Sequence, residues 1–235
     1  MKQWLDEGLT ALGITPPDGA VERLERYGAM LLEQNQVMNL TAITDPEQVA
    51  RLHFLDSAAL LGCADLRGVS LVDVGTGAGF PGVVLKILVP ELKLTLVDSL
   101  GKRLDWLGTV CAALGLEGVE RVHCRAEEQG LEVGYRDSFD FATARAVADL
   151  RVLCALCLPY VRPGGRFLAM KASGCEAEVS AAAGAVKALG GRLLAGYDYH
   201  IPGTDVDRRV VVVEKAGATP KGYPRRWAKI QKAPL

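Results

Sequence analysis

The fold is decided by the stretch Leu71-Val72-Asp73-Val74-Gly75-Thr76-Gly77-Ala78-Gly79-Phe80-Pro81-Gly82. Its first residues are mostly apolar and predict a buried strand. The glycines that follow let the backbone turn sharply and approach a ligand closely. Pro81 suits the opening of a helix. A glycine-rich loop between a strand and a helix predicts an α/β sheet with a binding crevice at the carboxyl ends of its strands.

From residue 70 onward, expected strands alternate with expected helices. The strand candidates are residues 71–74, 94–98, 120–124, 139–144, 166–171, 192–201 and 208–215. Such alternation predicts parallel strands with right-handed crossovers. Only residues 202–207 separate the last two candidates, which is too short for a crossover and predicts an antiparallel hairpin. We therefore expect an α/β fold with a mostly parallel seven-stranded sheet and an antiparallel terminal hairpin. This is the plan of the Rossmann-like class I S-adenosylmethionine-dependent methyltransferases, and it differs from that of the dinucleotide dehydrogenases.

The region before this sheet reads as helical. Its apolar residues recur at helical spacing, and it contains no strand signal. Thr44-Asp45-Pro46-Glu47 is a predicted capping box, in which Thr44 accepts from the third helical N–H and Glu47 reaches back. We expect an N-terminal helical extension over residues 1–66, a methyltransferase α/β domain over residues 67–218 and a basic tail over residues 219–235.

Composition limits the classes of protein. Of the 235 residues, 49% are hydrophobic and 23% are charged, which is typical of a globular protein. The net charge of −1 excludes a uniformly basic nucleic-acid coat. The first residues include Asp6 and Glu7 and form no apolar run, so we expect no signal peptide. The longest apolar stretch, near residues 83–89, is too short to cross a bilayer, so we expect no membrane partner. Six cysteines without a leader suggest reduced thiols, and we expect a cytoplasmic location. Cys154 and Cys157 form a C-x-x-C, but they share an apolar helical stripe, which favours core packing over redox or metal chemistry.

The tail has a one-signed charge. It contains Lys221, Arg225, Arg226, Lys229 and Lys232 and no acidic residue. This asymmetry favours contact with an anionic partner, with Tyr223 and Trp227 available to stack on bases. Two alternatives stay open: a solvated terminus, or a tail that packs on the body and buries Tyr223 and Trp227.

The glycine loop lacks the sequence features of nucleotide phosphate sites, and this narrows the class of ligand that it can bind. The dinucleotide fingerprint requires Gly or Ala where this chain has Phe80, and no G-x-x-x-x-G-K-[ST] motif is present. Pyrophosphate and triphosphate binding are therefore disfavoured. The loop instead resembles the first motif of methyltransferases, whose ligand carries a methionine ammonium and carboxylate. These groups need backbone polar groups and a nearby carboxylate such as Asp73.

Polar side chains follow the next expected strands at the point where each strand ends. Asp98 ends the second strand and is placed to accept both ribose hydroxyls; a helix cap is the alternative. Arg125-Ala126-Glu127 follows the third strand, where an adenine edge would lie, and Arg145 follows the fourth. Because parallel strands end at the same edge of a sheet, we expect these residues to line one site with the glycine loop.

Several segments together resemble one family. They are Asn39-Leu40-Thr41, His53-Phe54-Leu55-Asp56-Ser57, residues 73–82, Val97-Asp98-Ser99-Leu100-Gly101-Lys102-Arg103, Arg125-Ala126-Glu127, Ala144-Arg145-Ala146-Val147-Ala148, Ala169-Met170-Lys171 and Tyr223-Pro224-Arg225-Arg226. In this order they resemble the RsmG (GidB) family of bacterial 16S ribosomal RNA (guanine-N7) methyltransferases. The resemblance implies a cytoplasmic enzyme that transfers a methyl group from S-adenosylmethionine to a guanine in a decoding-region loop. The chain departs from the family pattern at Ala172-Ser173 and at Trp227.

The resemblance also implies site residues. Its cofactor positions fall on Gly75, Phe80, Ala126, Glu127 and Arg145, to which the loop and strand ends add Gly77 and Asp98. Asn39, His53, Arg225 and Arg226 are the candidates for contact with RNA. The expected partner is 16S rRNA or the small ribosomal subunit, and we expect a monomer without a metal. Guanine N7 has a lone pair and no proton, so the transfer needs no general base and we assign no catalytic residue.

Other functions stay open at this point. The main alternative is an S-adenosylmethionine-dependent methyltransferase for a different RNA, a protein or a small molecule. Phe80 and the terminal hairpin weigh against a nicotinamide-dependent oxidoreductase, and an intact loop with Asp98 weighs against a non-catalytic ribosome-binding module. His53, Asp56 and Ser57 share one helix face, which borders the ligand site or forms a buried cluster that ties the extension to the sheet.

Overall fold

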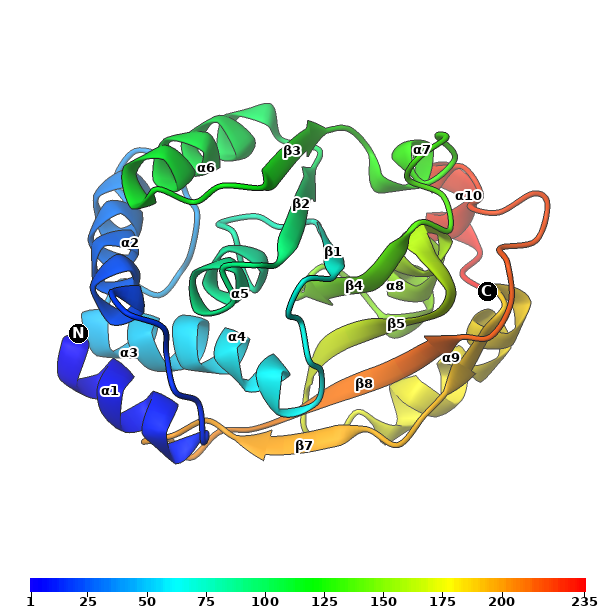
Figure 1. Ribbon diagram of the computed structural model, residues 1–235. Coiled ribbons are helices and arrows are strands. Elements are labelled where there is room, and N and C mark those ends of the chain that lie inside the picture. The colour runs from blue at the N-terminus through cyan, green and yellow to red at the C-terminus, as the bar shows by residue number, and fades with distance from the viewer.

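The computed structural model describes all residues from 1 to 235, and it contains one mixed sheet (Figure 1). The strands are β1 (Ser70–Val74), β2 (Lys93–Asp98), β3 (Val119–His123), β4 (Phe139–Arg145), β5 (Val161–Ala172), β6 (Gly191–Leu193), β7 (Tyr197–His200) and β8 (Asp207–Lys215). Their order is β3-β2-β1-β4-β5-β8-β6, and β7 also pairs with β8. Strands β1 to β5 are parallel, and β8 is antiparallel to its neighbours. The predicted fold class is confirmed.

The sheet has eight strands because one expected strand is divided. The predicted strand over residues 192–201 appears as β6 and β7, which both pair with β8. Leu193 pairs with Val213 and Tyr197 with Val210, so four steps along one strand match three along the other. The extra residue is a β-bulge. Gly196 lies within it, where an added Cβ would stand 3.2 Å from the Val210 carbonyl oxygen.

Helices cover both faces of the sheet (Figure 1). The helices are α1 (Lys2–Ala11), α2 (Ala20–Asn35), α3 (Pro46–Val49), α4 (Asp56–Ala58), α5 (Gly82–Leu88), α6 (Gly101–Leu114), α7 (Ala126–Gln129), α8 (Leu150–Cys157), α9 (Glu176–Ala188) and α10 (Trp227–Lys232). A π-helical turn over Ala50–Leu55 joins α3 to α4. None of these helices combines the length and apolar character that a bilayer span requires.

The core has two parts, one on each face. Helices α1, α2, α5 and α6 bury apolar side chains against Leu71 and Leu94 on one face. Helices α8 and α9 pack against Val72 and Val74 on the other. This alternation along β1 is the period-two pattern of a strand buried on both sides. Cys154 and Cys157 of α8 are buried in the second part, so the predicted core packing of the C-x-x-C is confirmed.

The predicted capping box is wrong by one residue. Asp45, and not Thr44, is the N-cap of α3, and its Oδ1 accepts a hydrogen bond of 2.9 Å from the Gln48 N–H. Glu47 turns away from the cap and accepts from Arg51 Nε at 2.8 Å. Pro46 accounts for the shift, because proline favours the first helical position and makes the residue before it the cap.

The C-terminal tail packs on the body of the protein. Arg136 donates hydrogen bonds to the carbonyl oxygens of Thr219 at 2.7 Å and Tyr223 at 2.5 Å. Lys215 is fully buried, and its Nζ donates to Asp137 Oδ1 and Thr219 Oγ1, both at 2.7 Å. Helix α10 follows beside α8. Of the arrangements that the sequence left open, the structure has the packed one, but Tyr223 and Trp227 are half-buried and not buried as that alternative expected.

Candidate functional site

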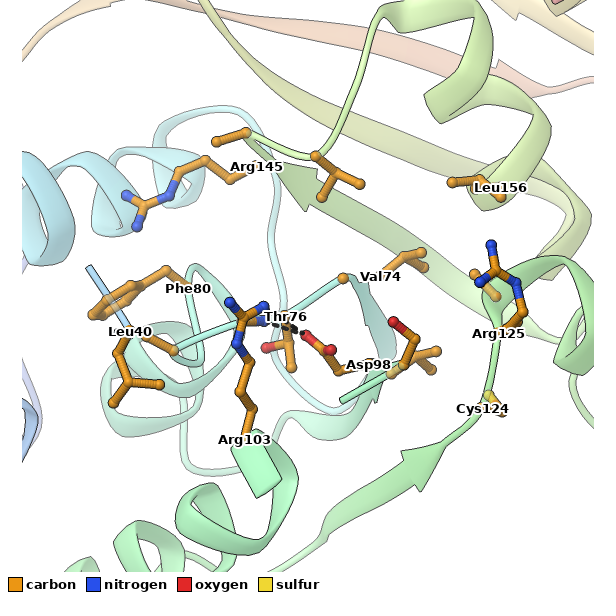
Figure 2. A pocket seen from close by; sticks show the side chains of 18 of the residues that line it. Leu40, Val74, Thr76, Phe80, Asp98, Arg103, Cys124, Arg125, Arg145 and Leu156 are labelled. Atoms are coloured by element: carbon orange, nitrogen blue, oxygen red, sulfur yellow. Dashed lines mark hydrogen bonds and ion pairs between the residues drawn. The ribbon is translucent and has the colours of Figure 1, made fainter. Parts of the chain in front are cut away.

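A cavity of about 620 Å³ lies at the carboxyl ends of β1 to β4 (Figure 2). Its size is typical of small-molecule sites. All the predicted cofactor residues line it: Gly75, Gly77, Phe80, Asp98, Ala126, Glu127 and Arg145. Of the RNA candidates, His53 lines it too, whereas Asn39, Arg225 and Arg226 do not. The sequence did not assign Thr41, Arg103 or Trp227 to this site, yet each of them lines the cavity.

The glycine loop presents backbone to the cavity. Gly75 and Gly77 have φ values of 71° and 57°, in the left-handed region that favours glycine. A Cβ at Gly75 would meet the Val147 side chain at 2.8 Å, so the β4–α8 loop lies directly over this residue. A Cβ at Gly77 would meet no protein atom closer than 3.9 Å. Since Gly77 lines the cavity, a side chain there would project into space that a ligand needs.

Asp73 supports the loop and does not line the cavity, contrary to our expectation for the ligand ammonium. Its side chain is fully buried. Its Oδ2 accepts from Thr76 Oγ1 at 2.7 Å and from the Gly82 N–H at 3.0 Å, which ties the two ends of the loop together. Burial raises the pKa of Asp73 to about 6.

Asp98 lies at the end of β2 and connects the loop to α6. Its Oδ2 accepts from the Gly77 N–H at 2.8 Å, and its Oδ1 accepts from the Leu100 N–H at 2.9 Å. Leu100 is itself the N-cap of α6, which has no side-chain cap bond, so Asp98 braces the turn before the helix and the predicted helix cap is not observed. A carboxylate has about four acceptor sites, so two backbone bonds leave capacity for ligand hydroxyls at the cavity floor. Arg103 Nη1 of α6 lies 3.8 Å from Asp98 Oδ2, and its positive charge balances that of the carboxylate (Figure 2).

The far end of the cavity lies beyond β3. Glu127 is almost fully buried there, and its Oε1 accepts a bond of 2.7 Å from Arg125 Nε. Cys124 and Leu156 add apolar surface on the same side (Figure 2). This end therefore combines a fixed carboxylate with apolar walls, which suits a flat heterocycle with polar edges.

Arg145 organises the opposite end. Its Nη1 donates to Asp56 Oδ2 at 2.9 Å, and its Nη2 lies 3.0 Å from His53 Nδ1. The guanidinium group also stands 4.9 Å from the centroid of the Phe80 ring, on which His53 stacks at 4.6 Å. Asp56 further accepts from Tyr199 Oη at 2.7 Å. Both interpretations of the His53 face therefore hold: Asp56 ties the helical extension to the sheet, and His53 borders the cavity.

His53 is held neutral by this arrangement. Burial and the positive charge of Arg145 lower the pKa of His53 to about 3. Because Arg145 Nη2 can only donate, His53 Nδ1 accepts, which assigns the ring proton to Nε2 and directs it to Thr41 Oγ1 at 2.8 Å. His53 is thus a fixed donor to Thr41 and not a proton carrier at neutral pH.

The neutral His53 predicts a loss of stability in acid. Histidine in the unfolded chain has a pKa of about 6.5. Below that pH the unfolded chain therefore binds a proton at residue 53, whereas His53 of the folded protein stays neutral, and protonation favours unfolding. Between pH 6.5 and 5 the free energy of unfolding should fall by about 1.5 kcal/mol on this account, and His53→Gln should remove that share. Urea unfolding of both proteins at the two pH values measures it. The raised pKa of Asp73 changes the free energy of unfolding in the opposite direction, but Asp73 is present in both proteins, so its effect cancels in the comparison. An equal loss of stability in both proteins would contradict a neutral His53 in the folded state.

Comparison with known proteins identifies relatives over the whole chain. The family model described as GidB, rRNA small subunit methyltransferase G, matches residues 20–200. A ribosomal RNA small subunit methyltransferase G of Acetivibrio thermocellus is 42% identical over 235 residues, covering 100% of this chain and 97% of the relative. One of Staphylococcus epidermidis is 45% identical over 234 residues, covering 99% and 98%.

Solved structures share the fold. A mutant of MtNAS in complex with S-adenosylmethionine aligns with a TM-score of 0.55 at 20% identity, over 83% of this chain and 77% of that one. An S-adenosylmethionine-dependent O-methyltransferase of Thermotoga maritima aligns with a TM-score of 0.53 at 17% identity, over 81% and 73%. Because the family model spans most of the sequence and the curated relatives match it from end to end, the chain belongs to the rRNA small subunit methyltransferase G (GidB) family.

Proposed function

We propose that this chain transfers the methyl group of S-adenosylmethionine to N7 of a guanine in a decoding-region loop of 16S ribosomal RNA. It acts in the cytoplasm, as a monomer, on 16S rRNA or the small ribosomal subunit. The observation that carries the proposal is the convergence of the glycine loop, Asp98, Glu127 and Arg145 on one cavity in a member of this family.

The cavity fits the methyl donor part by part. Gly75, Gly77 and Arg145 offer backbone and guanidinium groups near one end, where the amino acid part of the donor binds. Asp98 has acceptor capacity for the ribose at the middle, and Ala126 and Glu127 border the adenine at the other end. When bound, S-adenosylmethionine supplies an electrophilic methyl group on a sulfonium.

The chain's own part in the reaction is to position the two reactants. N7 of guanine would form its bond to the methyl carbon as the methyl–sulfur bond breaks and S-adenosylhomocysteine leaves. N7 carries a lone pair and no proton, so no side chain has to act as a base. His53 agrees with this, because its Nδ1 is occupied by Arg145 and its pKa is lowered to about 3. Methylation leaves a positive charge on the guanine. Pairing of Arg145 with Asp56 keeps the charge of Arg145 from opposing it.

The candidates for RNA contact in the loop before the cavity and in the tail differ in how accessible their side chains are. Asn39 is exposed and directly precedes Leu40 and Thr41, which line the cavity. Arg226 is exposed at the start of α10 and is free to reach a phosphate. Arg225 instead donates to the Ala233 carbonyl oxygen at 2.9 Å, so much of its role is to hold the tail.

Asp98→Ala should weaken cofactor binding by about ten- to a hundredfold. Hydrogen bonds to a charged group contribute about 1.5–3 kcal/mol, and the substitution removes those to the ribose. Calorimetric titration with S-adenosylhomocysteine gives the dissociation constant, and the melting temperature reports the loss of the bond to Leu100. A lower melting temperature with an unchanged dissociation constant would reduce Asp98 to a structural support of the glycine loop and of the turn before α6.

The reaction itself is tested with labelled S-adenosylmethionine and small ribosomal subunits from cells that lack this modification. We expect the label in 16S rRNA, on one guanine, with cleavage chemistry specific for N7-methylguanine marking the position. Free 16S rRNA, a purified protein mixture and small-molecule extracts serve as parallel acceptors. Label on another base, or only in the protein mixture or the small-molecule extracts, would overturn the proposal.

A further inference from the structure

Trp227 belongs to the wall of the cavity, although it lies in the C-terminal tail. Its indole ring stands 5.0 Å from the guanidinium carbon of Arg125. Arg125 in turn donates to Glu127 Oε1 at 2.7 Å. A continuous chain of contacts therefore runs from the tail, through Arg125, to the buried carboxylate at the far end of the cavity.

The position of Trp227 along the cavity indicates which part of a ligand it meets. The carboxyl ends of β1, β2 and β3 follow one another across the sheet. Asp98 at the end of β2 is the acceptor for the ribose, so the heterocycle extends toward the end of β3. Ala126, Glu127 and Trp227 line the cavity on that side. A flat purine between apolar walls gains free energy from an aromatic neighbour.

We infer that Trp227 contacts the adenine of the bound cofactor, so that the C-terminal tail forms part of the cofactor site. This inference rests on the proposed function. The tail is then more than a basic extension: its inner side completes the pocket, while Lys229 and Lys232 remain exposed on the outside.

The fold holds Trp227 in this place. Arg136 binds three carbonyl oxygens of the segment that leads to α10, those of Thr219, Pro220 and Tyr223. Beyond Trp227, Ile230 is fully buried in the core beside α8. The segments on both sides of Trp227 are thus anchored, which holds this residue at the cavity wall.

The test compares Trp227→Ala, Trp227→Phe and a matched control, Lys229→Ala, which alters an exposed side chain of the same helix. Calorimetric titration with S-adenosylhomocysteine should show about tenfold weaker binding for Trp227→Ala, because base–aromatic stacking has that order of magnitude. Trp227→Phe keeps a ring and should recover most of the affinity, and Lys229→Ala should bind as the wild type does. Melting temperatures establish that each variant is folded.

Tryptophan fluorescence distinguishes direct contact between Trp227 and the ligand from a purely structural role of Trp227. S-adenosylhomocysteine should quench tryptophan emission of the wild type, and Trp227→Phe, which retains Trp4 and Trp106, should lose most of that quenching. If the wild type binds but Trp227→Ala binds equally well and quenching persists in Trp227→Phe, the inference is overturned and the proposed function stands. If the wild type itself does not bind S-adenosylhomocysteine, the proposed function fails and the inference with it.

Discussion

Gly77→Val should abolish cofactor binding while the protein stays folded. Gly77 has a φ of 57°, and an added Cβ would meet no protein atom closer than 3.9 Å, so a valine side chain would project into the cavity. We expect the dissociation constant for S-adenosylhomocysteine to rise by roughly a hundredfold or more, which corresponds to about 3 kcal/mol. Calorimetric titration measures this directly.

Gly115→Val is the matched control. Gly115 has a φ of 63°, and its added Cβ would meet no atom within 4 Å, but it lies at the end of α6, away from the cavity. Both substitutions force a side chain into the left-handed region, at a cost of about 1–2 kcal/mol in stability. Similar melting temperatures with binding lost only in Gly77→Val would assign the effect to the cavity. Normal binding by Gly77→Val would remove the loop from the site.

Much of this site could be predicted from the sequence because it is built from consecutive strand ends. Asp98 ends β2, Arg145 ends β4 and Glu127 lies in the short helix after β3, and a parallel sheet brings such positions to one edge. The expected strand over residues 71–74 is β1 within one residue, because a local apolar pattern and a glycine loop define it.

The misplacement of Asp73 had a signal in the sequence. Val72 and Val74 face one part of the core, so Asp73 shares the other face with Leu71. It therefore points beneath the loop, toward the Gly82 N–H, and not over a ligand. Period-two alternation predicts this orientation, whereas the resemblance to a methyltransferase motif does not.

Other features depend on contacts between distant segments and have no local signal. Arg145, Asp56 and Tyr199 come from β4, α4 and β7, and only the folded sheet brings them together. Trp227 reaches Arg125 in the same way. The sequence showed that Trp227 departs from the family pattern, but only packing of the tail places it at the cavity.

Removal of residues 219–235 should lower stability and cofactor affinity together. The truncation uncovers the apolar surface beneath Ile230, removes Thr219 from Lys215 and Asp137, and opens the cavity wall at Trp227. Loss of one buried isoleucine side chain costs about 2–5 kcal/mol. In a protein of this size we therefore expect the melting temperature to fall by roughly 5–15 °C. Thermal unfolding and titration with S-adenosylhomocysteine of the same sample measure both effects, and an unchanged melting temperature would contradict the packed tail.

The charge of the tail is tested separately in the full-length chain, by Arg226→Ala, Lys229→Ala and Lys232→Ala combined. These side chains are exposed, so their removal should leave the melting temperature and the affinity for S-adenosylhomocysteine unchanged. If they contact phosphates, each contributes a slope of about −0.7 to a log–log plot of RNA affinity against salt, and the slope should flatten by roughly 2. An unchanged slope would place the RNA elsewhere on the surface. A flattened slope with unchanged affinity for S-adenosylhomocysteine would mean that the exposed side of α10 contacts RNA, while its inner side, which carries Trp227, borders the cofactor cavity.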